Sequence, residues 1–501
     1  MSAAQLKIAM GLCLATILLA VLDMNIVSAA TVPISQDLDP AHGIEKIPWL
    51  ISAFALASAA ALPLYGKLCD TLGAKKVFIG AIATFLFGSA LCGAAQSMDQ
   101  LIAARALQGI GGGGLMSITM VVIAQLKGPG EKSGPKSGGG IGGIVAGAGM
   151  AIGPSIGGFL SEHANWRWIF YVNLPIGIAV LIAAVLVLKL PAGPVRHRID
   201  FAGAGLAAAF AVCLLLVTEW GGKTYAWSSP QILALTVGCF GTLALFLRRQ
   251  ATAAEPILPL TLFKVPELRY GFAIQGLVGA SMMGAIVYVM IYLQTVRSVA
   301  STSAGLYLIP LAIGMSLVGI LAGRLSDRGV TTRSTVICGT LIATATFALL
   351  ATTGTDTSLW AIRGELFLMG AGFGLLIGQL IQYVQGAAPA HQLGVATTAI
   401  RFFQTLGNAI GAAVFGTVLA RLYEAHGPGS SAGAIATLTG AAHTRALGAL
   451  TDSIGVVFWC ASGLMAVAAV LALRLPRTAA EQAGADGAGL PAQPATSRVA
   501  A

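Results

Sequence analysis

Charged residues are scarce in this chain. Asp, Glu, Lys and Arg make up only 10% of its 501 residues, against about 25% in ordinary soluble proteins. Hydrophobic residues make up 56%, and the mean hydropathy is +0.84. So few charges could not cover a water-exposed surface, which excludes a soluble enzyme, a disordered chain and a fibrous repeat. The chain is therefore predicted to lie in a membrane.

Motifs for catalysis, metals and nucleotides are also missing from the sequence. The seven cysteines form no CxxC pair, which favours a role as small hydrophobic residues. The histidines lack metal-ligand spacing, and no nucleophile stands near a base. The glycine runs at 109–114 and 137–143 follow no strand and lack the G-x-x-x-x-G-K-[ST] pattern. We therefore expect no enzyme activity, no metal, no cofactor and no direct use of ATP.

Apolar residues instead form long continuous runs. Runs of about twenty residues suffice to cross about 30 Å of hydrocarbon as helices, which satisfy their own backbone hydrogen bonds in lipid. Barrel strands would show alternation over about ten residues. We predict an all-α integral membrane protein with fourteen spans. They lie near residues 8–30, 47–65, 77–96, 101–124, 141–161, 168–189, 200–219, 230–248, 270–293, 304–322, 334–353, 361–384, 396–423 and 454–474.

Lysines and arginines concentrate on alternate connections between these spans. With the N-terminus inside, the inward segments carry 20 of the 29 basic residues and the outward ones carry 6, while Arg105, Arg363 and Arg401 lie within spans. Cytoplasmic loops carry such an excess, so both termini are predicted to be cytoplasmic in a bacterial cell membrane. The net charge of +10 then requires no nucleic-acid partner.

One sequence pattern occurs twice. GKLCDTLGAKK at 66–76 and GRLSDRGVTTR at 323–333 share G-x-L-x-D followed by basic residues. The repeat predicts two related six-helix units with binding between them, near the membrane midplane. We expect a six-helix bundle over 1–190, an inserted pair over 191–250, a second bundle over 251–475 and a disordered cytoplasmic tail over 476–501. The outward connection 424–453 would be the longest.

Two charged residues lie at similar depth within the predicted spans. Asp23 is about 22 Å above the inner start of the first span, and Arg105 is about 6 Å below the outer edge of the fourth. They could pair if their helices are neighbours. The pair could be a structural salt bridge only, or Asp23 could be a titratable group whose protonation Arg105 controls.

Two further motifs suggest moving parts. In GAGMAIGPSIGGFL, Pro154 removes a backbone hydrogen bond in mid-helix, which would make a kink for close packing or a hinge that shapes an outward gate. Asp70 lies near a helix end, where it could cap a helix N-terminus. The alternative for that loop is simple anchoring in the membrane by Lys75 and Lys76.

Together these strings resemble the major facilitator superfamily, and more narrowly its fourteen-helix drug:proton antiporter family. The resemblance is strongest over residues 1–180 and includes NWRWIFYVNLPIG at 165–177. The loop motif departs from the family pattern at Thr71 and Ala74, where arginines are usual. The matching positions are Leu22, Asp23, Val27, Ala30 and Pro33 in the first span, Gly66, Leu68, Asp70, Gly73 and Lys75 in the loop, Arg105, Gln108 and Gly109 in the fourth span, and Gly149, Gly153, Pro154, Gly157 and Gly158 in the fifth.

The resemblance implies two six-helix bundles with two inserted helices, and a monomer that exports an amphipathic small molecule in exchange for protons. Asp23 and Arg105 would couple the proton, and the loop and fifth-span motifs would serve gating. The fifth-span motif accompanies export in this family. An alternative is a dedicated exporter of one endogenous metabolite, such as the cell's own antibiotic, a peptide or an amino acid. A non-transporting receptor or scaffold is a third reading, which the costly buried Asp23 disfavours.

Polar and aromatic residues within the spans are candidates for the substrate cavity, with hydrogen bonding or packing between helices as the alternative. In the family that the chain resembles, members that carry dicationic compounds tend to have additional membrane carboxylates. Few carboxylates besides Asp23 lie deep in these spans, so the resemblance implies neutral, zwitterionic or monocationic substrates. The cavity candidates are Asn25, Gln108, Gln275, Tyr288, Tyr292, Gln379, Phe403, Gln404 and Asn408.

Overall fold

The computed structural model describes residues 3–40, 43–127, 153, 156–157, 159–161, 163–188, 190, 200–222, 224–299, 305–426, 435 and 439–476. Within these ranges, thirteen helices are long and apolar enough to cross a membrane. They confirm thirteen of the fourteen predicted spans. The remaining one, at 141–161, lies mostly outside the described residues.

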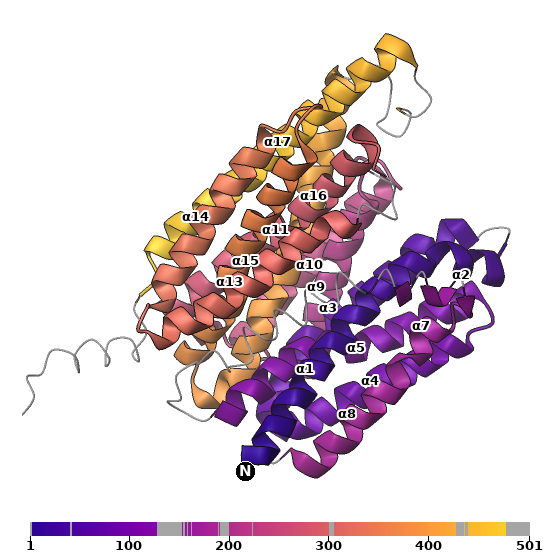
Figure 1. Ribbon diagram of the computed structural model, residues 1–501. Coiled ribbons are helices and arrows are strands. Elements are labelled where there is room, and N and C mark those ends of the chain that lie inside the picture. The colour runs from indigo at the N-terminus through magenta and orange to yellow at the C-terminus, as the bar shows by residue number, and fades with distance from the viewer. Residues whose placement is uncertain are drawn as a thin grey trace, which may run out of the picture.

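The first bundle contains the helices that precede residue 190 (Figure 1). A 3-10 turn at Val27–Ala30 ends the first span four residues after Asp23, and Pro33 lies in the first turn of the next helix, where its missing N–H is tolerated. The described helices of this bundle are α1 (Ala3–Ile26), α2 (Thr31–Leu38), α3 (Gly43–Leu72), α4 (Ala74–Ala94), α5 (Met98–Lys127), α7 (Trp168–Tyr171) and α8 (Asn173–Val187).

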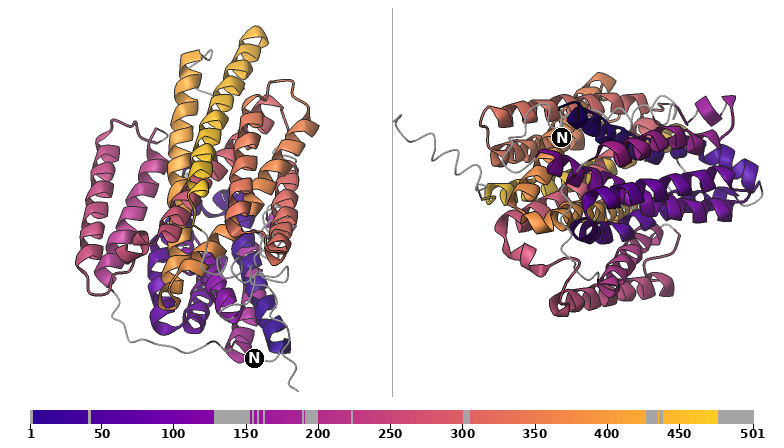
Figure 2. Two further views of the ribbon diagram at one scale, coloured as in Figure 1. Left: turned by 90° about the vertical axis from the view of Figure 1, so that its left-hand side faces the viewer. Right: turned by 90° about the horizontal axis from the view of Figure 1, so that it is seen from below.

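The inserted pair and the second bundle follow. The pair, α9 (Phe201–Trp220) and α10 (Pro230–Thr252), stands beside both bundles (Figure 2). The second bundle consists of α11 (Pro266–Ile291), which continues as a π-helical turn at Tyr292–Val296, α13 (Ile309–Asp327), α14 (Thr332–Ala351), α15 (Leu359–Ala387), α16 (Leu393–His426) and α17 (Gly440–Leu473). Short 3-10 turns lie at Leu260–Lys264, Gly305–Leu308 and Ala390–Gln392.

The predicted loop at 424–453 is wrong over 440–453. Helix α17 begins at Gly440 and α16 continues to His426. The segment GAAHTRALGAL that opens α17 is rich in alanine and leucine, which favour helix. It also buries Ala446 and Leu450. Hydropathy marks only the lipid-crossing part of this helix, so the sequence placed its start too late.

Glycines allow the helices of each bundle to approach closely. A Cβ atom added at Gly109 of α5 would lie 2.4 Å from the carbonyl oxygen of Phe54 in α3. One added at Gly407 of α16 would lie 2.0 Å from the carbonyl oxygen of Gly276 in α11. Backbone thus meets backbone at these crossings, as is common where small residues mediate helix packing in membranes.

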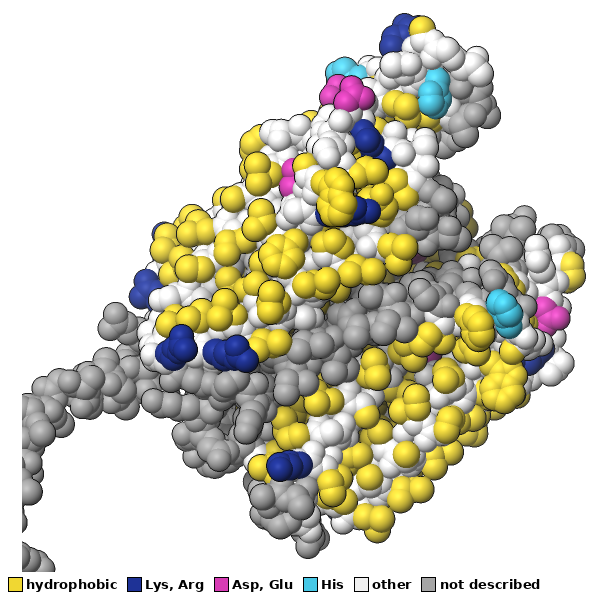
Figure 3. Space-filling model, viewed as in Figure 1, with side chains coloured by type: hydrophobic (Ala, Val, Ile, Leu, Met, Phe, Trp, Pro, Cys, Tyr) yellow, Lys and Arg dark blue, Asp and Glu magenta, His cyan; other side chains and the backbone are white. Residues whose placement is uncertain are grey.

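Charged side chains gather toward the helix ends, and hydrophobic ones cover the flanks (Figure 3). Large apolar side chains on the flanks, such as Leu186, Val237 and Phe240, are 71%, 72% and 68% exposed. We call the end that holds Lys67, Lys75 and Arg249 the basic end. The ribbons of the two bundles lie closer together there and diverge toward the opposite end (Figure 1).

Candidate functional site

Asp23 of α1 and Arg105 of α5 form a buried ion pair. Nη1 of Arg105 donates to Oδ2 of Asp23 over 2.9 Å, and the two residues are 0% and 2% exposed. The contact predicted from depth alone is therefore present. Both charges lie within membrane-spanning helices, where an unpaired charge would be costly.

Three uncharged residues complete a network around this pair. Nε2 of Gln108 and Nδ2 of Asn173 each donate to Oδ1 of Asp23 over 2.8 Å. Both amides also donate to Oγ of Ser89 over 3.1 Å, and Ser89 in turn donates to the carbonyl oxygen of Phe170 over 3.0 Å. Asp23 thus accepts from three side chains on α5 and α8. The sequence gives Ser89 no role, includes Asn173 only as part of the string at 165–177, and predicts Gln108 both as a fourth-span motif residue and as a cavity residue.

Arg105 also connects this network to α3. Its Nε donates to the carbonyl oxygen of Leu50 over 3.4 Å, and its guanidinium lies 4.3 Å from the ring centre of Phe54. Its Nη1 further donates to Oε1 of Gln108 over 2.7 Å. Asp23 therefore balances the charge of a guanidinium that also contacts α3 and Gln108.

Asp70 joins the two bundles at the basic end. Its Oδ1 accepts from the backbone N–H of Gly394 over 2.7 Å, and its Oδ2 accepts from that of Val395 over 2.9 Å. These N–H groups belong to the first turn of α16, where the helix dipole favours a negative charge. Asp70 therefore does cap a helix N-terminus, as predicted, and the helix belongs to the other bundle.

Neighbouring residues of the same motif shape this contact. A Cβ atom at Gly66 would lie 2.9 Å from Cα of Val395 and closer still to Thr398, so only glycine fits here without displacement. Gly73 has a φ of +87°, which permits the tight turn between α3 and α4. Nζ of Lys75 donates to the carbonyl oxygen of Val185 near the end of α8, over 2.9 Å.

The fifth-span motif is described only in part. Gly149, Pro154 and Gly158 lie outside the described residues, whereas Gly153 and Gly157 lie within them. A Cβ atom at Gly157 would lie 2.3 Å from the carbonyl oxygen of Ile26. This part of the motif therefore lies against the end of α1, three residues after Asp23.

Several cavity candidates lie where α11, α15 and α16 meet. Gln275 is 0% exposed, and among the described residues neither of its amide atoms has a hydrogen-bond partner. Oε1 of Gln379 and Oδ1 of Asn408 are also buried without a partner in that part of the chain. Gln404 accepts from Arg401 over 2.7 Å, and the ring of Phe403 stacks on Phe272 with 5.4 Å between ring centres.

The other cavity candidates have different surroundings. The hydroxyl of Tyr292 donates to the carbonyl oxygen of Gly354 over 2.7 Å, which places it at the end of α14. Tyr288 packs edge-on against Phe415, with 6.4 Å between ring centres. Asn25 belongs to α1, and its side chain lies outside the described part of the structure.

A connection at the opposite end fixes α2 against the segment before α7. Nε1 of Trp166 and Nη1 of Arg167 donate to Oδ2 of Asp37 over 2.9 and 2.8 Å. These hydrogen bonds, first that of Trp166 and then that of Arg167, hold the pKa of Asp37 below its usual value. The string NWRWIF therefore holds this end of the first bundle together.

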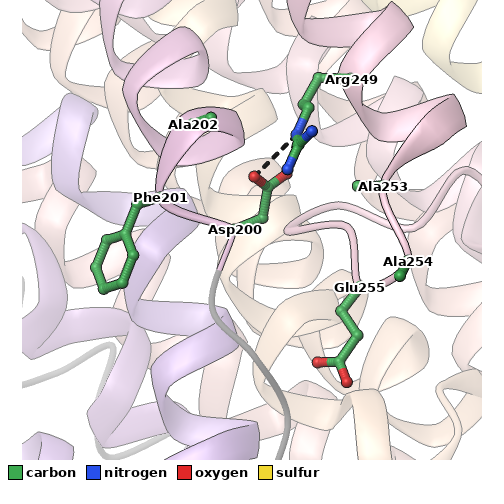
Figure 4. Close-up of a pocket in the computed structure, with 7 residues that line it drawn as sticks. All are labelled: Asp200, Phe201, Ala202, Arg249, Ala253, Ala254 and Glu255. Carbon is green, nitrogen blue, oxygen red and sulfur yellow. Dashed lines mark hydrogen bonds and ion pairs between the residues drawn. The ribbon is translucent and has the colours of Figure 1, made fainter.

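A surface pocket of about 310 Å³ lies at the basic end, far along the chain from the Asp23 network (Figure 4). Arg249 and Asp200 both line it and form an ion pair, with 3.0 Å between Nε and Oδ1. Glu255, which also lines it, lies 3.5 Å from Nζ of Lys67 in α3. These ion pairs join the ends of α9 and α10 to each other and to the first bundle.

Residues 12–412 match the family described as Major Facilitator Superfamily. The chain belongs to the Major Facilitator Superfamily. It is therefore an integral, multi-pass membrane transporter and not an enzyme, as the sequence predicted. The crossing of α5 over α3 at glycines, the buried pair and the Asp70 contact all occur within this matched range.

Similar proteins narrow the class further. The chain is 34% identical over 400 residues to "Multidrug transporter protein MdtP" of Bacillus subtilis (strain 168), covering 79% of this chain and 72% of that one. It is 30% identical over 407 residues to "Multidrug resistance protein 3" of the same organism, covering 81% and 78%. Among solved structures, the proton:xylose symporter XylE is similar with a TM-score of 0.61 at 14% identity, covering 97% and 99%. That structure supports the fold alone.

Proposed function

We propose that this transporter exports amphipathic drugs or antibiotics in exchange for protons, and that it acts as a monomer by alternating access. The observation that carries the proposal is the Asp23 network. A carboxylate that is 0% exposed in a membrane helix, balanced by one guanidinium and two amides, is a group whose protonation changes its surroundings. The printed names of the two Bacillus relatives support drugs as the cargo.

In this scheme Asp23 takes up a proton from the outside and releases it to the cytoplasm, while substrate moves outward. Two ligands can drive one another only if they favour different conformations. Ionised Asp23 favours the arrangement described above, in which Arg105, Gln108 and Asn173 all point at its carboxylate. A protonated Asp23 favours an arrangement in which Arg105 finds other partners.

The conformation described is the one closed at the basic end. Asp70 bonds to the start of α16, and the Gln385 amide of α15 donates to the Met120 carbonyl oxygen of α5 over 3.4 Å. Lys and Arg concentrate on this end, which by the positive-inside rule would face the cytoplasm with both termini. The conformation described would then be the outward-open one, and the inward-open conformation would separate Asp70 from α16.

The test is drug-driven proton movement in everted membrane vesicles. We expect Asp23→Asn to abolish proton release on addition of a transported drug while the protein still inserts, because the amide cannot exchange a proton. Asp356→Asn, at an exposed position between α14 and α15, serves as the matched control and should behave as wild type. Full proton coupling in Asp23→Asn would remove the basis of the proposal.

A further inference from the structure

Arg401 is another arginine inside a membrane-spanning helix, and no counter-charge for it lies among the described residues. It lies eight residues after the start of α16, about 12 Å along the helix. Its Nη1 donates to Oε1 of Gln404 over 2.7 Å. Within the described ranges no Asp or Glu lies within ion-pair distance of it, in contrast to Arg105. Charged residues within spans are costly and mark functional sites.

The neighbours of Arg401 on α16 define where it points. Thr398 and Phe402 pack on α3, at Gly66 and near Ala59. Gly407 and Gly411, on another side of the helix, pack on the backbone of α11. At about 100° per residue, Arg401 lies between these two sides of the helix.

Other residues on the same side of α16 as Arg401, which we call the Arg401 stripe, contact residues at the boundary between the bundles. Thr397, one turn before Arg401, accepts a hydrogen bond from the Gln385 amide over 3.1 Å, and that amide also reaches Met120 of the first bundle. Asn408, about two turns after Arg401, lies on the same side. Arg401 therefore faces the region between the two bundles, where an exporter of this family binds its cargo if the proposed function holds.

Unpaired amide atoms lie on α16 and on its neighbour α11. Oδ1 of Asn408 is buried without a hydrogen-bond partner among the described residues, and a Cβ atom at Gly279 of α11 would lie 2.9 Å from it. Gln275, one turn before Gly279, is 0% exposed with both amide atoms unpaired in the same part of the chain. Buried polar groups are nearly always satisfied, so these amides have hydrogen-bonding capacity left for a further polar partner.

We propose that Arg401 binds an anionic group of the exported compound, such as a carboxylate, and that the unpaired amides of Asn408 and Gln275 bind other polar atoms of the same compound. This assignment deepens the proposed function and rests on it. A guanidinium presents a planar fork that matches a carboxylate with two hydrogen bonds. The substrate class becomes amphipathic acids and zwitterions. The substrate charge expected from the sequence rested only on the scarcity of carboxylates in the spans. It did not consider an arginine without a counter-charge.

The test compares rhodamine B, which carries a free carboxylate, with its ethyl ester, which does not. Binding of each dye to the purified full chain in detergent is measured by fluorescence polarisation. We expect Arg401→Gln to weaken binding of rhodamine B about tenfold or more, since a hydrogen bond to a charged group contributes about that factor, and to change ester binding by less than about twofold. Arg401→Lys should lie between, because it keeps the charge and loses the fork.

Arg421→Gln is the matched control, because Arg421 is an exposed arginine on the same helix, and it should bind both dyes as wild type does. An equal loss for both dyes in Arg401→Gln, with normal elution on size exclusion, would show a gating or structural role and overturn the assignment. So would wild-type affinity in that variant, or no rhodamine B binding by wild type. Acid-selective binding without drug-driven proton movement would refute the proposed exchange and leave the anion site standing.

Discussion

Removing the Asp70 carboxylate should open the basic end. Asp70 accepts backbone hydrogen bonds from Gly394 and Val395 over 2.7 and 2.9 Å, at the positive end of α16. Hydrogen bonds to a charged group contribute about 1.5–3 kcal/mol, and the loss of an N-cap costs about 1 kcal/mol. With partial replacement by water at this half-buried site, we expect Asp70→Ala to cost the closed state about 2 kcal/mol, which is about a 30-fold change in the closed-to-open ratio.

Asp70→Asn should give a smaller effect. The amide oxygen still accepts one hydrogen bond, but the charge that favours the helix N-terminus is gone. We expect a loss of about 1 kcal/mol, or about fivefold in the ratio. If the closed-to-open ratio falls from wild type to Asp70→Asn and again to Asp70→Ala, the first step measures the contribution of the charge and the second that of the remaining hydrogen bond.

The measurement is a distance distribution by electron spin resonance between two labels at the basic end. Lys76 and Arg328 are exposed and belong to different bundles, so cysteines at these positions report separation of the bundles. The native cysteines are replaced first, because two of them, Cys338 and Cys460, are exposed. The fraction of the longer distance should rise from wild type to Asp70→Asn to Asp70→Ala.

Asp200→Ala is the matched control. Asp200 also caps a helix N-terminus at the basic end, accepting from Gly203 over 3.0 Å, but it does so within the inserted pair. Its loss should leave the distance between bundles unchanged. Equal distance distributions in wild type and Asp70→Ala would refute the reasoning, because they would show that the hydrogen bonds to α16 do not hold the bundles together.

Three other outcomes are expected. Arg105→Ala should lose nearly all drug-driven proton movement and should unfold at a lower temperature, since breaking a buried ion pair costs about 3–5 kcal/mol. Arg105→Lys should retain part of the proton movement and part of the stability. Equal activity of the two variants would contradict this. Because the Trp166 hydrogen bond holds the pKa of Asp37 below its usual value, the stability difference between wild type and Asp37→Asn should be constant above about pH 4 and shrink as the pH falls further; a difference that grows in acid would be the wrong sign. Topology tags at Tyr225 and Ala253 should read external and cytoplasmic respectively, and two cytoplasmic readings would mean that the inserted pair does not cross.

The sequence was sufficient to pair Asp23 with Arg105, because charges in an apolar run are conspicuous and helical rise gives their depth. The same depth calculation could have found Asn173. The predicted sixth span begins at Trp168, and Asn173 lies five residues later, about 8 Å along. Arg105 lies seven residues after the start of α5, about 10 Å along. Asn173 was missed because it carries no charge. Ser89 had no such signal, since a serine in a membrane helix is usually satisfied by its own backbone.

The partner of Asp70 could not be predicted from the sequence. The local pattern predicts that Asp70 caps a helix N-terminus, and several helices begin at the basic end. Selecting α16 requires the packing of the two bundles, since Asp70 and Gly394 are 324 residues apart. Similarly, the start of α17 depends on helix propensity beyond the lipid-crossing run, which a hydropathy scan does not see.

Helix α3 contacts both the Asp23–Arg105 network and the start of α16 at the basic end. Near one end, Leu50 and Phe54 contact Arg105, and near the other, Asp70 bonds to α16. Twenty residues, about 30 Å of helix, separate Leu50 from Asp70. We expect α3 to couple the two sites, which only a measured response of one site to a change at the other can establish. If protonation of Asp23 loosens the hold of Arg105 on α3, then Asp23→Asn, which mimics the protonated state, should raise the fraction of the longer distance at the basic end without any change to Asp70. An unchanged distribution would place the coupling on other helices, and a lower fraction would reverse its sign.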